Sequence, residues 1–101
     1  MVKAKFRIRD DEASFTLSGH AGAGEAGEDI VCAAASSAAY MAANTITEIL
    51  GVEAEAEARG GYMRFSFGGS TAAADIVKGL RLHLRELQAQ YPDNVQVTTE
   101  E

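Results

Sequence analysis

The stretch VKAKFRIRDDEASFTLS, residues 2–18, decides the fold of this chain. Apolar and polar side chains alternate through residues 2–9, and they alternate again through residues 13–18. A period of two places alternate side chains on opposite faces of a strand. The acidic residues 10–12 between the two runs form a polar turn. The stretch therefore predicts a β-hairpin with one apolar face and one face in water.

A second hairpin is predicted from residues 52–58 and the stretch YMRFSF at residues 62–67, with Gly60 and Gly61 in the turn. The outer face of residues 52–58 is acidic, whereas that of residues 3–9 is basic. Opposite charges directly across a strand pair contribute about 0.2–1 kcal/mol. The charge pattern thus favours a sheet in which these two strands are neighbours, although it does not decide the strand order.

The first predicted helix covers residues 29–50. Its first half is rich in small side chains, so another backbone can approach it closely. Asp29 is of a type that caps helix N-termini, and Gly51 follows the last turn as a stop signal.

A second helix is predicted to begin at Ser70 or Thr71 and to end near residues 91–92. A short last strand follows at residues 95–97. The apolar stripe of this helix comprises Ile76, Val77, Leu80, Leu84 and Leu87. The order ββ-α-ββ-α-β predicts one α+β domain over residues 1–101, an antiparallel sheet of two hairpins plus a short C-terminal strand, packed by two helices.

The size and net charge of the chain limit the classes of partner that it can bind. The chain has 101 residues and is 47% hydrophobic, much of it alanine, so its core is thin and a homodimer is expected. A net charge of -6 argues against a broad basic face for direct nucleic-acid binding and favours a basic partner. We expect no membrane partner and a cytoplasmic location, because the sequence shows neither an apolar run of about 18 residues nor a signal-peptide core.

Residues 19–37, GHAGAGEAGEDIVCAAASS, carry the candidate chemistry. With Asp29 as N-cap, the only cysteine, Cys32, falls in the first helical turn, where unpaired N–H groups and the helix dipole favour the thiolate. A thiolate can attack carbonyl carbon, and His20, just after a strand end, can act as its general base. Asp29, Cys32 and Ser36 share one helix face, so Asp29 could orient the imidazole and Ser36 could position the thiol or the substrate.

The segment between His20 and the helix is expected to be a mobile loop. It has no Gly-Lys-Ser/Thr ending and carries Glu25 and Glu28, so it is not a phosphate cradle. The small residues assigned to this loop are Gly19, Ala21, Gly22, Gly24 and Gly27.

These residues also have readings without catalysis. A lone cysteine in an alanine-rich helix is more often a small buried hydrophobe, and His20 can simply pair with a carboxylate. No metal is expected, because one cysteine and two distant histidines give too few ligands, and no cofactor is expected. His83 lies off the apolar stripe and is expected to be solvated or interfacial. A cysteine peptidase, a non-catalytic interaction module and a redox sensor through Cys32 all stay open at this point.

The motifs Gly-His-Ala at residues 19–21 and GEDIVCAAAS at residues 27–36 resemble the signature of the Prp (YsxB-like) family of ribosomal-processing cysteine proteases. The stretches GGYMRFSF and QYPDNVQV also resemble that family, so the likeness spans nearly the whole chain. It implies a homodimeric α+β protein whose partner is the precursor N-terminal peptide of large-subunit ribosomal protein number twenty-seven.

The resemblance also implies roles for single residues. Cys32 corresponds to the nucleophile and His20 to the general base, whereas Asp29 and Ser36 match motif positions with less certain roles. Residues 21–28 correspond to a cover that orders on substrate. A cysteine endopeptidase is therefore the function we expect, and a non-catalytic ribosome-associated assembly or interaction module is the alternative.

Overall fold

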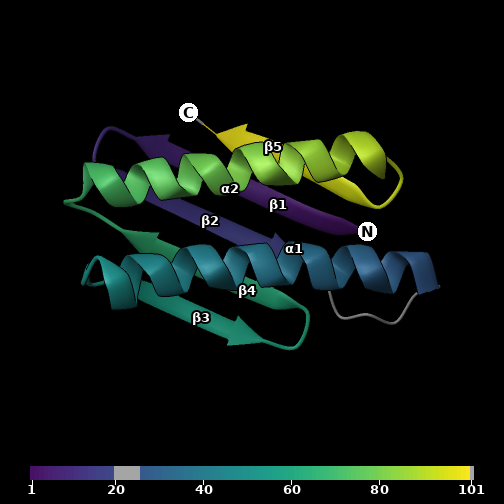
Figure 1. The fold of residues 1–101 in the computed structure, drawn as a ribbon, viewed down its shortest axis with the longest axis horizontal. Helices are drawn as coiled ribbons and strands as arrows, with labels where there is room; N and C mark the ends of the chain where they lie inside the picture. The colour runs from purple at the N-terminus through teal and green to yellow at the C-terminus, as the bar shows by residue number, and fades with distance from the viewer. Residues whose placement is uncertain (20–25, 101) are drawn as a thin grey trace.

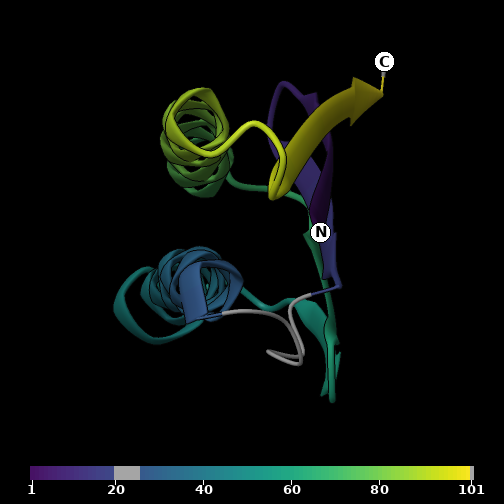
Figure 2. The ribbon, with the colours of Figure 1, turned by 90° about the vertical axis from the view of Figure 1, so that its right-hand side faces the viewer.

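The computed structural model describes residues 1–19 and 26–100, with the backbone alone at residues 26–29. Five strands form one sheet in the order β3-β4-β2-β1-β5, and both helices lie on the same face of it (Figures 1 and 2). The predicted order ββ-α-ββ-α-β is confirmed. The elements are β1 (Val2–Arg9), β2 (Glu12–Ser18), α1 (Ala26–Asn44), a π-helical turn η1 (Thr45–Ile49), β3 (Glu55–Arg59), β4 (Tyr62–Phe67), α2 (Thr71–Gln90) and β5 (Val95–Glu100).

The sheet is mixed rather than wholly antiparallel. The pairs β1–β2, β2–β4 and β3–β4 are antiparallel, whereas β5 pairs with β1 in parallel. Two antiparallel pairs separate β4 from β1, so β4 and β5 run in the same direction with α2 between them. A parallel return of this kind needs a crossover connection, and α2 provides it across one face of the sheet.

The strand order suggested by charge is wrong. The basic strand β1 and the acidic strand β3 are separated by β4 and β2. The acidic strand instead meets a cation on its own hairpin partner, because Glu57 lies opposite Arg64 in the β3–β4 register. Local hairpin pairing therefore prevails over the longer-range match between β1 and β3.

Aromatic rings fill the core on the helix side of the sheet. Phe6, Phe15 and Phe65 lie opposite one another on β1, β2 and β4, with neighbouring ring centroids 5.9 and 5.6 Å apart. Phe67 extends the group, its centroid 6.0 Å from that of Phe65. Tilted rings at these distances pack favourably beyond the area that they bury.

Helix α1 packs on this core mainly through small side chains. Its buried residues are Val31, Cys32, Ala35, Ala39, Ala42 and Ala43, and Ile46 continues the stripe in η1. The helix begins at Ala26, so the expectation that Asp29 caps it is wrong. It widens into η1, where the Leu50 N–H bonds the Thr45 carbonyl oxygen at 3.0 Å, and the chain turns away at Gly51, whose φ is +67°.

Helix α2 begins as the sequence predicts. The Ser70 hydroxyl accepts a hydrogen bond from the Ala73 N–H at 3.0 Å, which confirms Ser70 as the N-cap. The helix ends at Gln90, and β5 then runs further than the predicted residues 95–97.

One segment of the described chain, Ile30–Ile49, is long and apolar enough to cross a membrane by length and composition. Its mean hydropathy is 1.2, and its apolar residues include the buried stripe that packs on the sheet. A core helix meets the same test, so this observation does not assign the chain to a membrane.

Candidate functional site

The candidate nucleophile lies on the face of α1 that packs against the sheet. Cys32 is only 3% exposed and belongs to the continuous apolar core. Its neighbours in that core include Val31 and Ala35 on the same helix. The sulfur is thus held in a fixed position at the edge of a packed interior.

A polar backbone atom of Gly19, the residue that directly follows β2, lies beside the sulfur. The Gly19 carbonyl oxygen lies 3.9 Å from Cys32 Sγ, within reach of a weak S–H···O contact. Thirteen positions separate the two residues in the sequence. The fold therefore brings Gly19, the first residue of the Gly-His-Ala motif, to the cysteine motif.

The backbone of Gly19 is fixed from two sides. Its N–H donates to the Gly61 carbonyl oxygen at 3.0 Å, which ties the end of β2 to the β3–β4 turn. Its φ is +79°, and a Cβ built on it would lie 2.1 Å from the Met1 carbonyl oxygen. Only glycine accepts both the positive φ and this close approach. The start of β1 and the β3–β4 turn thus hold the chain where it leaves the sheet beside Cys32.

Several predicted site residues lie outside the described part of the structure. These are His20, Ala21, Gly22 and Gly24, and for Gly27 and Asp29 only the backbone is described. By helical spacing Asp29, Cys32 and Ser36 still share one face of α1. Ser36 is half-buried one turn beyond Cys32.

The expectation that Cys32 occupies the first helical turn is corrected. Because α1 begins at Ala26, the N–H groups without an intrahelical acceptor belong to the residues up to Glu28. Cys32 lies in the second turn, and the effect of the helix dipole falls off within the first. Thiolate stabilisation by free N–H groups at Cys32 is therefore not the basis of this site. Ionisation of the thiol then depends more on a charged partner such as an imidazolium.

No cluster of three or more metal-ligating side chains occurs among residues whose placement the structure describes. His83 is exposed on α2, in agreement with its predicted position off the apolar stripe. It borders a groove of about 550 Å³ between the two helices, which pattern reasoning did not find. The sequence feature that could have predicted this groove is the presence of small residues on α1 and of Gly79 on α2, because small side chains leave space between the helices.

Comparison with known proteins identifies the family. A family model described as cysteine protease Prp matches residues 1–96. The chain is 31% identical over 109 residues to the ribosomal processing cysteine protease Prp of Bacillus subtilis, covering 98% of this chain and 97% of that protein.

Solved structures share the fold. SMU.848 from Streptococcus mutans is 29% identical and superposes with a TM-score of 0.83, covering 98% of this chain and 93% of that one. The TM-score is also 0.83 for a crystal structure of the essential ribosomal processing protease Prp from S. aureus in complex with a substrate peptide. That protein is 22% identical, and the match covers 99% of this chain and 100% of that one. With a family model that spans almost the whole sequence, this chain belongs to the Prp family of cysteine proteases.

Proposed function

We propose that this cysteine protease removes the N-terminal extension of large-subunit ribosomal protein number twenty-seven, with Cys32 as nucleophile and His20 as general base. Asp29 and Ser36 orient the imidazole and position the thiol or the substrate from the same helix face. The predicted cover over the substrate then lies between β2 and α1, with Gly19, Ala21, Gly22 and Gly24, whereas Gly27, which was also assigned to it, belongs to the first turn of α1.

The observation that carries the assignment is the contact between Gly19 and Cys32. The Gly19 carbonyl oxygen lies 3.9 Å from the sulfur, and the next residue in the chain is His20. The hydrogen bond to Gly61 and the close approach of Met1 fix this end of β2. The position of Gly19 beside the thiol supports the pairing of Cys32 with His20, the next residue in the chain.

The chemistry follows the usual course of covalent peptide cleavage. His20 takes the thiol proton as the sulfur attacks the scissile carbonyl carbon. The tetrahedral intermediate collapses, the C–N bond breaks, and the leaving amine receives that proton from His20. Water, deprotonated by His20, then attacks the thioester. The C–S bond breaks, the acid product leaves, and the sulfur regains its proton from His20.

Two observations support the substrate class. The Bacillus subtilis relative is named a ribosomal processing protease, and the S. aureus relative has been crystallised with a substrate peptide. The net charge of -6 suits a basic extended substrate such as the tail of a ribosomal protein, because opposite charge raises encounter rates. The proposal places the enzyme in the cytoplasm, where that substrate is made.

The test uses the precursor protein and mass spectrometry of its cut ends. Wild type should release the extension at one bond, whereas Cys32→Ala and His20→Ala should each lose at least about 100-fold in rate. His83→Ala is the matched control, because His83 is the only other histidine and is exposed. Retained cleavage by Cys32→Ala would contradict the proposed nucleophile. The proposed substrate would be contradicted if wild type cut other peptides but left the precursor uncut.

The burial of Cys32 favours one other reading, a non-catalytic ribosome-associated module in which the sulfur only packs. Iodoacetamide labelling distinguishes the two, since Cys32 is the only thiol in the chain. The protease assignment predicts labelling of the native protein that a substrate peptide slows and that His20→Ala also slows. The packing role predicts labelling only after unfolding.

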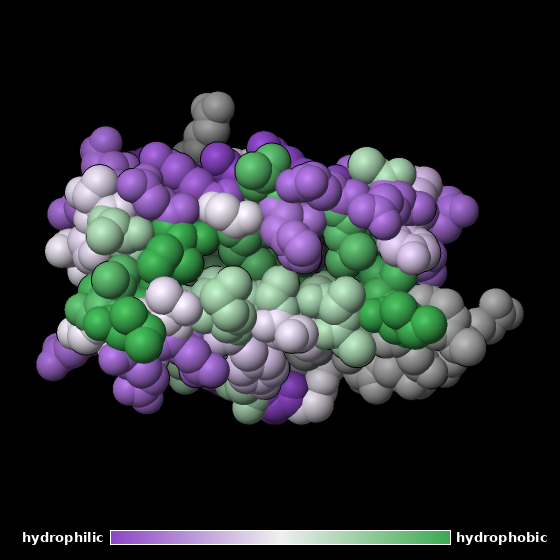
Figure 3. All heavy atoms as spheres, viewed as in Figure 1, coloured by the Kyte–Doolittle hydropathy of each residue, from purple (hydrophilic) through white to green (hydrophobic). Residues whose placement is uncertain are grey.

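We also propose that the protein is a homodimer through the helix side. Figure 3 shows apolar surface gathered along and between the two helices. Ile30 and Met41 on α1 are each 65% exposed, and Leu82 on α2 is 60% exposed. Met41 lines the 550 Å³ groove between the helices, together with Ala38 and Gly79. A second copy would bury this surface and supply the second core that the thin monomer core lacks.

A further inference from the structure

The face of the sheet opposite the helices carries no helix in the described part of the chain (Figure 2). Alternate residues of every strand point to this open face. On β1 they are all cationic and all exposed, and we call them the basic stripe: Lys3, Lys5, Arg7 and Arg9. At about 3.4 Å per residue, successive charges of the stripe stand roughly 7 Å apart in one line.

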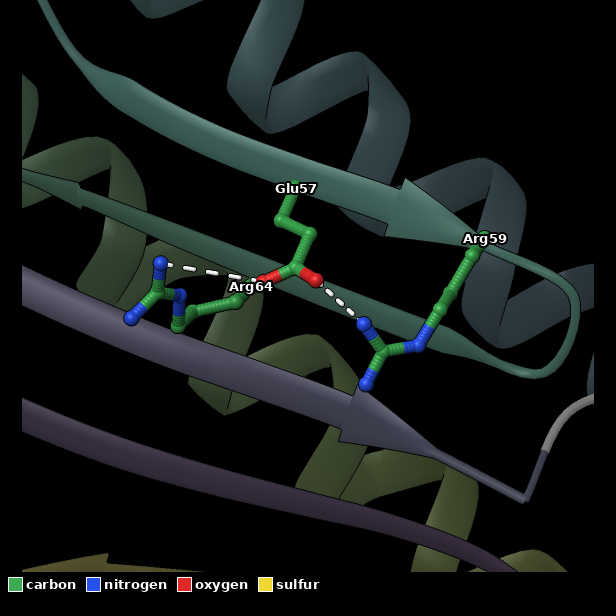
Figure 4. Close-up of polar contacts among 3 residues, drawn as sticks. All are labelled: Glu57, Arg59 and Arg64. Carbon is green, nitrogen blue, oxygen red and sulfur yellow. Dashed lines mark hydrogen bonds and ion pairs between the residues drawn. The ribbon is translucent and has the colours of Figure 1, made fainter.

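The acid Glu57 on the edge strand β3 is engaged within its own hairpin, whereas Glu12 and Glu100 lie directly opposite Arg9 and Arg7 of the stripe. Glu57 on β3 contacts Arg59 through one carboxylate oxygen, and its other oxygen lies 3.7 Å from an Arg64 guanidinium nitrogen (Figure 4). Within residues 1–19 and 26–100, no member of the basic stripe forms an ion pair. Four aligned like charges without partners repel one another, and an anionic ligand would relieve that repulsion.

The surroundings of the stripe differ between its two ends. Lys3 and Lys5 lie opposite Ser18 and Thr16 on β2, and opposite Gln96 and Thr98 on β5. These neighbours are neutral hydrogen-bonding groups. At the other end, Arg7 and Arg9 line a hollow of about 220 Å³ together with the hydroxyls of Ser14 and Ser66, and Glu12 also lines it. Glu100 lies opposite Arg7 on β5. The lysine end is therefore the less compensated part of the stripe.

The net charge of the chain does not cancel this local field. The Cα extent along the shortest axis, which runs through the helix layer and the sheet, is 19 Å. The Debye length at physiological ionic strength is about 8 Å, so acids on the helix side are largely screened from a ligand on the open face. The expectation of no direct nucleic-acid contact averaged the charge over the chain, whereas the fold gathers four cations in one line on the open face.

The chemistry of the face selects the class of polyanion. We propose that the open face binds the backbone of single-stranded RNA along the basic stripe. The line of charges beside Ser14, Thr16 and Ser18 matches a phosphate backbone with 2′-hydroxyls. Tyr62 lies on the same face, where Arg59 stacks over its ring at 4.6 Å, and this pair offers a base-stacking platform. An anionic membrane fits less well, because membrane-binding surfaces carry large apolar side chains. Those exposed in the described chain all lie outside the five strands.

The test is fluorescence anisotropy of a labelled mixed-sequence RNA 12-mer at several salt concentrations. Wild type should bind, and the triple variant Lys3→Gln, Lys5→Gln, Arg7→Gln should bind at least about 10-fold more weakly with a salt slope reduced by about 2 units. The control Lys78→Gln, Arg81→Gln, Arg85→Gln removes the same charge from α2 and should change affinity less than about twofold. Unchanged circular dichroism and peptide cleavage in both variants show that the fold is intact.

Three outcomes overturn the proposal. One is no RNA binding by wild type at about 0.05 M salt, a condition that favours phosphate contacts. Another is an equal loss in the stripe variant and the α2 control, which would indicate diffuse attraction to any cation. The third is a preference for another polyanion. Displacement of RNA by a poly-glutamate peptide at equal charge concentration would assign the face to an acidic protein. Tighter binding to phosphatidylserine vesicles than to RNA would assign it to a membrane.

Discussion

The carbonyl oxygen of Met1 occupies the space where a side chain on residue 19 would begin, 2.1 Å from a Cβ built on Gly19. Met1, which directly precedes β1, therefore fixes the backbone of Gly19, where the chain leaves β2. The same glycine reaches Cys32 through its carbonyl oxygen at 3.9 Å. A packing detail at the start of the chain thus sets the geometry of the candidate catalytic site.

Gly19→Ala should destabilise the protein and reduce cleavage. A non-glycine residue at positive φ costs about 1–2 kcal/mol, and here the Met1 backbone must also move. Gly51→Ala is the matched control, because Gly51 has a φ of +67° and nothing within 4 Å of the added Cβ. Urea unfolding should show a larger loss for Gly19→Ala, and only that variant should lose cleavage rate. Equal losses in both variants would show that the Met1 backbone gives way without consequence.

Phe15 lies between two aromatic neighbours, and its replacement should cost more than that of a ring at the end of the group. Each aromatic pair contributes about 0.5–1.5 kcal/mol beyond buried area. Phe15→Leu removes the pairs with Phe6 and Phe65, whereas Phe67→Leu removes only the pair with Phe65. Denaturant unfolding should therefore give Phe15→Leu the greater loss in the free energy of unfolding. The reverse order would show that the two ring pairs of Phe15 do not govern the loss.

The alternating and helical patterns predicted the five strands and both α-helices, but not the π-helical turn η1, because each pattern is a local property of the chain. The hairpin of residues 2–18 and the cap at Ser70 are examples, since both depend on residues close in sequence. The parallel pairing of β5 with β1 could not be predicted in this way, because it depends on how α2 crosses the sheet. The charge match between β1 and β3 predicted the wrong strand order, because strand order also depends on connections between residues far apart in the sequence.

The candidate site shows a similar division. The motif around Cys32 and the motif at Gly19 were identifiable in the sequence, and the contact between them is a product of the fold. The start of α1 was predicted at Asp29, since Asp is a common cap, but the helix extends back to Ala26. The added residues are Ala26, Gly27 and Glu28. A cap at Asp29 is a preference of about 1 kcal/mol, which the backbone hydrogen bonds of a further turn can outweigh.

Ser70→Ala should lower stability without affecting the chemistry. The Ser70 hydroxyl accepts from the Ala73 N–H at 3.0 Å, and loss of such a cap typically costs about 1 kcal/mol. Thr71→Ala is the control, because Thr71 is exposed and lies one position further into the helix. Thermal unfolding should show a lower midpoint for Ser70→Ala than for Thr71→Ala. The cleavage rate below the transition should match wild type in both, and a rate loss in Ser70→Ala alone would link the start of α2 to the site.

Met41→Glu should separate the proposed dimer into monomers. Met41 is 65% exposed on α1 and lines the groove between the helices, so a second copy would bury it. Burying a side chain of this size stabilises by about 1.5–3 kcal/mol, whereas an unpaired carboxylate in the same place opposes association. Sedimentation velocity should show a dimer for wild type and mostly monomer for Met41→Glu at equal concentration. Gln96→Glu adds the same charge to the exposed open face and should leave the dimer intact. Dissociation by Gln96→Glu with an intact Met41→Glu dimer would instead place the interface on the open face of the sheet.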